Sequence, residues 1–194
     1  MPTLSIPSPL LEFDEAAHIY RLDGRVIPSV TQVLASVGII DPSKYGAGAA
    51  EFGSEVHAAC EMYDLLGEVS NDPRIEPYLA AWAGFRRQKQ LDFDPERIEF
   101  RACHADLGYA GTVDRATDDL IIDIKSGGVE RWHRLQSSAY AWAMPEPLKY
   151  DRWCVYLRND ATYMIHTYPK SETRRDASLF LAALAVHQWR NNGN

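Results

Sequence analysis

One short segment limits what this chain can fold into. Residues 120–125 read Leu-Ile-Ile-Asp-Ile-Lys, an apolar run of strand length that carries one acid and one lysine. Such a run, rich in isoleucine, is typical of a central strand covered on both faces. In a strand, Asp123 and Lys125 point to the same face, away from the flanking isoleucines. A carboxylate and an ammonium group in this setting cost free energy unless they are paired or bound to something. The segment therefore predicts either a simple ion pair or a functional site.

A second acid, Asp114, lies in the segment before this strand. Residues 109–116 predict a strand, and the turn at residues 117–119 folds it back, so that Asp114 can approach Asp123. Two neighbouring carboxylates repel each other unless one holds a proton or a cation lies between them. A hard divalent ion, Mg²⁺ or Mn²⁺, suits this oxygen environment and can bridge to a phosphate. We therefore expect a site for one or two such ions, with the backbone carbonyl of Ile124 as a further ligand.

Lys125 and Glu99 complete the chemistry that we expect there. Lys125 could position or deprotonate a water molecule, or stabilise negative charge on a phosphorane. Glu99, on a predicted strand at residues 97–103, could contribute a further acid through the water shell of the metal. A bound metal acts as a Lewis acid and lowers the pKa of its water. Phosphodiester hydrolysis needs this combination, so a metal-dependent phosphodiesterase is the first hypothesis.

The remaining segments predict one α/β domain with a mixed sheet over residues 1–194. We divide it into an N-terminal hairpin and short helix (1–40), a helical region (41–92), a sheet core (97–168) and a C-terminal helix (171–194). The helical region should contain a loop at 41–53 and helices at 54–66 and 73–91. The sheet core should contain strands at 97–103, 109–116, 120–125, 149–157 and 161–168, with a helix at 129–144. Thr173 and Asp176 would offer a capping box for the last helix.

Two helical segments bring further polar side chains toward the expected site. Gly53-x-x-x-His57 opens an amphipathic helix, and Glu61 follows His57 by four residues, so the two side chains can converge. His57 could equally be a structural histidine, and Glu61 could fix its tautomer or lie on a solvated helix face. Gln136 and Tyr140 have the same spacing in the helix at 129–144. Gln136 could bind the Lys125 region or a nucleotide phosphate, or belong to a polar helix face.

Taken together, these motifs resemble the PD-(D/E)XK nuclease superfamily, most closely its RecB-type branch. The resemblance covers residues 53–157 and rests on Gly53-x-x-x-His57, Glu99, Gly111-x-x-Asp114, Asp123-x-Lys125 and Gln136-x-x-x-Tyr140. It implies a restriction-endonuclease-like core, with a central mixed β-sheet flanked by helices. It implies Asp114, Asp123 and His57 as metal ligands, Lys125 as the catalytic lysine and Glu99 as an accessory acid. The branch often carries an iron–sulfur cluster, but this chain lacks a suitable set of cysteines, so we expect none.

The resemblance implies a divalent-metal-dependent deoxyribonuclease, an exonuclease acting on DNA ends or single strands in phage-type recombination, replication or repair. Stand-alone exonucleases of phages and prophages are similar, as is mitochondrial genome maintenance exonuclease. A recombination protein is a candidate partner. The alternatives are a structure-specific endonuclease, or a non-catalytic or regulatory member of the fold that binds nucleic acid or protein. The motifs do not determine the direction of degradation (5′ or 3′), the number of strands cut or the choice between DNA and RNA. They also do not determine an oligomeric state.

The charge of the chain bears on the nucleic-acid hypothesis. Acidic residues outnumber basic ones by 27 to 20, which gives a net charge of −7, whereas binding by phosphate neutralisation usually needs a basic surface. Any basic path must therefore be local, and the balance mildly favours the non-catalytic alternative. Most tryptophans should lie in the core, but Trp132, beside Arg131 and Arg134, suits stacking on a single strand.

Composition also sets expectations about the compartment. The three cysteines are widely separated and form no CxxC motif, which favours reduced thiols. No apolar run approaches the length of a membrane span, so we expect no membrane contact. The first eleven residues lack the basic start and apolar core of a signal peptide. We therefore expect a cytoplasmic protein, in a bacterial host cell if the chain is encoded by a phage or prophage.

Overall fold

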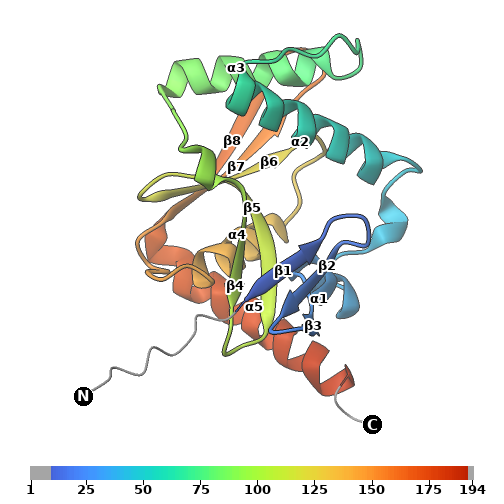
Figure 1. Ribbon diagram of the computed structural model, residues 1–194, viewed down its shortest axis with the longest axis vertical. Helices are drawn as coiled ribbons and strands as arrows, with labels where there is room; N and C mark the ends of the chain where they lie inside the picture. Colours follow the sequence, from blue (N-terminus) through green and yellow to red (C-terminus); the bar gives the residue numbers. More distant parts are fainter. Residues whose placement is uncertain (1–9, 192–194) are drawn as a thin grey trace.

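Five strands form a central mixed sheet in a computed structural model of the chain, which describes residues 10–191 (Figure 1). In spatial order they are β4 (Ile98–His104), β5 (Tyr109–Ala116), β6 (Leu120–Lys125), β7 (Asp151–Leu157) and β8 (Tyr163–Tyr168). Neighbours are antiparallel except β6 and β7, which are parallel. Their crossover contains helix α4 (His133–Trp142), as a parallel pair requires. The expected mixed α/β sheet, with all five of its strands, is therefore present.

Helices cover both faces of this sheet (Figure 1). On one face, α2 (Ala49–Leu66) and α3 (Glu76–Lys89) pack Val56 and Trp82 against Ile122 and Ile124. On the other face lie α1 (Val30–Ser36), α4 and α5 (Lys170–Asn191), which pack around Ile121. The isoleucines of β6 thus enter both layers of the core, because successive strand residues point to opposite faces.

The N-terminal segment forms a small sheet of its own. Strands β1 (Leu11–Asp14), β2 (Ile19–Leu22) and β3 (Arg25–Ile27) pair in order, and Tyr20 and Ile27 pack on Ala110 of β5. Short 3₁₀ helices lie at Pro42–Lys44 and Pro95–Arg97. The absence of a signal peptide, expected from the first residues, concerns a segment largely outside the described part, and residues 192–194 of the expected C-terminal helix also lie outside it.

Several element boundaries differ from the expectations, and one expected cap is absent. Helix α2 begins at Ala49 and not at residue 54, so Gly53 lies inside it, where its backbone keeps helical geometry. The helix expected at 129–144 begins only at His133, after the Gly127-Gly128 pair. The capping box at Thr173 and Asp176 is wrong, because α5 already begins at Lys170 and both side chains are buried inside it.

Among residues 10–191, no helix combines the length and the apolar character that crossing a bilayer requires.

Gly111 of β5 lies directly beneath the aromatic ring of Tyr140. A Cβ atom at this position would lie 2.5 Å from Cε1 of Tyr140, which is itself buried. We predict that Gly111→Ala lowers the free energy of unfolding by about 1–3 kcal/mol, because the ring must shift within a packed core. Urea denaturation measures the change. Gly84→Ala is the matched control, since Gly84 lies in α3 with open space around it, and there alanine should leave stability equal or up to about 1 kcal/mol higher. Equal effects of the two substitutions would contradict the prediction.

Candidate metal centre

The hydrogen-bond ladder between β5 and β6 opens at Asp114. The strands pair regularly at Arg115 and Ile122, and the same register continued would set Asp114 opposite Asp123. Instead, the carboxylate of Asp114 accepts a hydrogen bond of 2.6 Å from the backbone N–H of Ile124. A side chain therefore replaces the neighbouring strand as the partner of the β6 backbone.

His57 contacts the second backbone polar group of Ile124, its carbonyl oxygen. Its Nε2 lies 2.9 Å from the carbonyl oxygen of Ile124, which can only accept, so Nε2 carries the proton and donates it. The second ring nitrogen, Nδ1, consequently faces two carboxylates, 3.7 Å from Asp114 and 3.8 Å from Glu99. A lone pair on Nδ1 in this position is electrostatically unfavourable unless a proton or a cation lies between the three groups.

Glu99 occupies an unusual backbone position on β4. Its neighbours pair with β5 at Ile98–Arg115 and Phe100–Val113, whereas Glu99 itself has a φ of +47°. This left-handed conformation costs a residue with a side chain roughly 1–3 kcal/mol and persists only where the surroundings impose it. It occurs here at a residue whose Oε1 lies close both to His57 and to Nη1 of Arg115, the latter at 3.0 Å.

His57, Glu99 and Asp114 form the group that could hold a metal ion. One ligand atom from each lies within 4.8 Å of the others, and Asp114 is buried while the other two are partly exposed. The donor set fits a cation, because two carboxylates and one imidazole nitrogen converge on a space where their lone pairs otherwise repel. Glu99, expected only as an accessory acid, is thus part of the candidate ligand set itself.

Asp123 and Lys125 lie beside this group as an ion pair. Nζ of Lys125 is 2.8 Å from Oδ2 of Asp123 and donates to Oε1 of Gln136 at 2.9 Å. Gln136 in turn donates to the hydroxyl of Tyr140 at 2.8 Å. Burial raises the pKa of Asp123 to about 6, with Asp114 contributing in the same direction and Lys125 opposing it. Cys154 lies against the same carboxylate, with Sγ 3.6 Å from Oδ2 of Asp123.

Gln136 is therefore a buried partner of the lysine and Tyr140 a buried partner of Gln136, and neither belongs to a solvent-facing helix surface. Both come from α4, which packs on the sheet. Glu61 is half-buried one helical turn beyond His57, and burial together with the nearby charge of Glu99 raises its pKa.

Of the three remaining candidates, Trp132 lies at the site, Arg131 is exposed beside it, and Arg134 points away. Trp132 lies over the lysine, with Nζ of Lys125 5.5 Å from the ring centroid, and its Nε1 donates to the hydroxyl of Tyr45 at 3.1 Å. Arg131, next to it, is exposed. Arg134 turns away from the site: it pairs with Glu172 and Asp176 of α5 at 2.7 and 2.9 Å. Its guanidinium therefore ties α4 to α5.

Sequence reasoning missed two charged residues behind this group: Arg115, which contacts Glu99, and Asp64, which contacts Arg115. Arg115 is fully buried between Glu99 and Asp64, a residue of α2. One signal was present: Arg115 follows Asp114 within an apolar strand, where an unpaired cation would be costly. Its partner could not be found in the same way, because Asp64 looks like an ordinary acid on an amphipathic helix.

No protein-family model matches the chain, and a search of curated proteins finds no match either.

The protonation of His57 provides a test of this geometry. Burial lowers the pKa of His57, but the charge of Asp114 and the interactions with Glu99 outweigh it and raise the pKa to about 9, above the ordinary 6.5. In the metal-free protein the charged imidazole thus stabilises the fold fully below about pH 6.5, and this contribution is lost as the pH rises through about 9. We predict an NMR titration midpoint for His57 near pH 9, and a lower midpoint in Asp114→Asn. A midpoint near 6.5 in the wild type would contradict the arrangement.

Proposed function

We propose that the protein is a divalent-metal-dependent nuclease that hydrolyses phosphodiester bonds in DNA. One observation carries the proposal: the ligand group of His57, Glu99 and Asp114 lies directly beside a lysine held by Asp123 and Gln136. Metal ligands next to a fixed positive charge are what an attack on a phosphodiester requires. We further propose an exonuclease of phage-type recombination, replication or repair, on the strength of the motif resemblance to RecB-type PD-(D/E)XK nucleases.

The proposed ion is Mg²⁺ or Mn²⁺. Carboxylate oxygens suit both ions, and the imidazole nitrogen of His57 moves the preference toward Mn²⁺. When bound, the ion would supply Lewis acidity and a water molecule of lowered pKa. Oδ2 of Asp114 accepts the N–H of Ile124 and is also the atom that lies 3.7 Å from Nδ1 of His57, so the backbone hydrogen bond fixes the carboxylate that would bind the ion.

Lys125 suits the stabilisation of charge better than the removal of a proton. Burial lowers its pKa, but the carboxylates of Asp123 and Asp114 outweigh burial and raise it, so the side chain is an ammonium ion at neutral pH. An ammonium group cannot accept a proton from water, but it can stabilise the negative charge that develops on the phosphoryl oxygens. Gln136 limits its motion by accepting one of its three hydrogens.

Trp132 and Arg131 provide a short path for the substrate. Trp132 is half-exposed and lies over Lys125, and Arg131 beside it is exposed. An aromatic ring next to a cation suits an unpaired base and its phosphate. Such a local path is compatible with the acidic net charge of the chain, because it needs no extended basic face.

Degradation of labelled linear DNA with Mn²⁺ or Mg²⁺ tests the proposal. We expect Asp114→Asn and Lys125→Met each to lower the rate about 10²- to 10⁴-fold, since each removes a group required in the transition state. Asp118→Asn is the control for the loss of one negative charge, because Asp118 is exposed in the turn after β5, with 84% of its side chain accessible. DNA labelled at the 5′ or the 3′ end, and circular DNA, distinguish an exonuclease from an endonuclease. A wild type that binds DNA without cutting it would support the non-catalytic alternative instead.

The proposed role of Trp132 has its own test. Trp132→Ala should raise KM for single-stranded DNA about 5- to 100-fold, the loss of one stacked base, with a smaller effect on kcat. Trp132→Phe is the matched control: it keeps an aromatic face but loses the hydrogen bond to Tyr45. Equal losses in the two variants would show that the hydrogen bond matters and that stacking does not.

A further inference from the structure

Behind the candidate metal centre, a chain of buried charges links two helices to Glu99. Arg115 is 0% exposed, and its Nε donates to Oδ2 of Asp64 at 2.6 Å while its Nη1 donates to Oε1 of Glu99 at 3.0 Å. The guanidinium thus spans the distance between a helix and the β4 strand. Its planar shape and five donors in fixed directions suit this bridging position, which an ammonium group could not reproduce.

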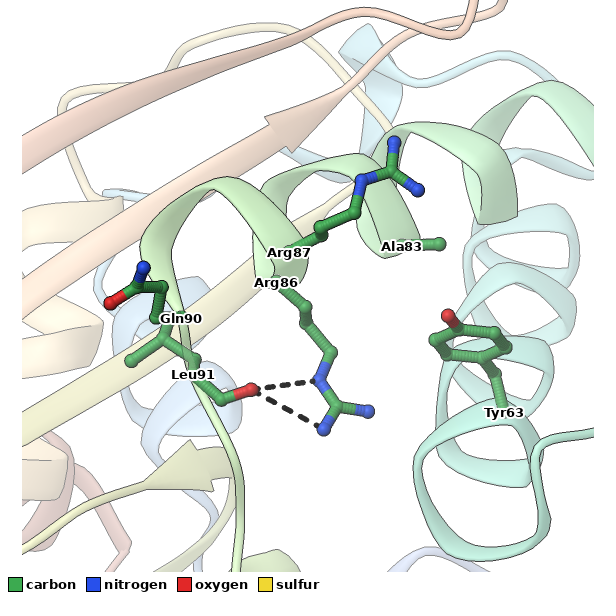
Figure 2. Close-up of a pocket in the computed structure, with 6 residues that line it drawn as sticks. All are labelled: Tyr63, Ala83, Arg86, Arg87, Gln90 and Leu91. Carbon is green, nitrogen blue, oxygen red and sulfur yellow. Dashed lines mark hydrogen bonds between the residues drawn. The ribbon is translucent and has the colours of Figure 1, made fainter.

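Asp64 is itself held from a third direction. Its side chain is 0% exposed and accepts hydrogen bonds from Nε1 of Trp82 at 2.9 Å and from Nη1 of Arg86 at 2.6 Å, both on α3. Arg86 also lines a surface pocket of about 300 Å³, where its guanidinium donates to the carbonyl of Leu91 (Figure 2). The contacts with α3 therefore fix the orientation of Asp64 independently of Arg115.

Glu99 needs such support for two physical reasons. Its backbone has the unfavourable φ of +47°, and its carboxylate lies in one group with that of Asp114. Without a positive charge behind it, Glu99 would lower its energy by turning toward solvent and by relaxing the backbone. Arg115 opposes this movement, because it compensates the charge and fixes the position of the oxygen.

Helix α2 carries both ends of this arrangement. His57 and Asp64 are seven residues apart, close to two full turns, and so lie on the same face. One helix thus supplies a candidate ligand directly and controls another through Arg115.

We infer that Arg115, oriented by Asp64, is a positioning residue that holds the Glu99 carboxylate in the ligand set of the metal centre. The inference rests on the proposed function, since it assigns the residues that support the same site. Residues of this kind typically change metal affinity 10- to 100-fold when they are altered.

Calorimetric titration of the metal-free protein with Mn²⁺ tests the inference without relying on activity. Arg115→Lys keeps the charge but cannot bridge both carboxylates, and Asp64→Asn keeps the shape but loses the charge that orients Arg115. We expect each to raise the Kd for Mn²⁺ about 10- to 100-fold. Because either variant can also lose stability, Mn²⁺ binding is measured only below its thermal transition, and the shift of Tm on adding Mn²⁺ provides a second measurement.

Arg152→Lys is the matched control. Arg152 is also 0% exposed and forms a buried pair with Asp176 at 2.8 Å, but it contacts α4 and α5 and not the ligand group. It should cost comparable stability while changing the Kd less than about twofold. If it weakens Mn²⁺ binding as much as Arg115→Lys does, a general loss of stability explains the effect and the inference is wrong.

A double-mutant cycle identifies the residue through which Arg115 acts. In a Glu99→Gln background, the effect of Arg115→Lys on the Kd should shrink to less than about twofold, because the positioned carboxylate is already gone. An unchanged effect in that background would overturn the inference. If Arg115→Lys and Asp64→Asn bind Mn²⁺ like the wild type while His57→Ala binds more weakly, the metal site stands and only the positioning role fails. A wild type without a Mn²⁺ site would overturn the proposed function itself.

Discussion

The backbone of Ile124 is held by side chains where a neighbouring strand would normally hold it, and the geometry of the site follows from this exchange. Asp114 accepts its N–H and His57 donates to its carbonyl. A buried backbone N–H and a buried carbonyl must each find a partner, so the opening between β5 and β6 fixes the positions of these two side chains. The oxygen of Asp114 that accepts this N–H, Oδ2, also lies 3.7 Å from the second nitrogen of His57. The position of both candidate ligands is thus a consequence of how the sheet satisfies its own backbone.

The buried charges around this opening alternate in sign. The carboxylate of Asp123 is neutralised by Lys125, and that of Glu99 by Arg115. The imidazole of His57 lies beside Asp114, and Lys125 also acts on this carboxylate; in the absence of metal the charge of Asp114 helps to raise the pKa of His57 to about 9. A divalent cation could take the place of this proton, because the same three groups surround it. Asp123 and Glu99 thus each have a cationic partner, whereas the space between His57, Glu99 and Asp114 contains no fixed positive charge other than this proton.

The layers on the two faces of the sheet have different roles. Helix α4 fixes the lysine through Gln136 and Tyr140, whereas α2 supplies His57 and, through Asp64, supports Glu99. Proposed chemistry and proposed ligand binding thus depend on helices that lie on opposite faces of the sheet. Asp123, Asp114 and Glu99, the acids at the centre of the site, are paired or serve as candidate ligands.

The sequence by itself determined the five strands, the mixed character of the sheet and the identity of the polar residues on it, because strand periodicity and turn residues are local properties. It also indicated that Asp114, Asp123 and Lys125 belong together, and it left Gln136 open between the Lys125 region and a polar helix face. Only the tertiary structure decided how these groups divide: it pairs Asp123 with Lys125 and brings Glu99 into the ligand group. In the tertiary structure Arg134 pairs with α5, and Arg115 lies between the carboxylates of Asp64 and Glu99. These outcomes depend on a left-handed residue in β4 and on contacts between elements far apart in the chain, which no pattern within a single element encodes.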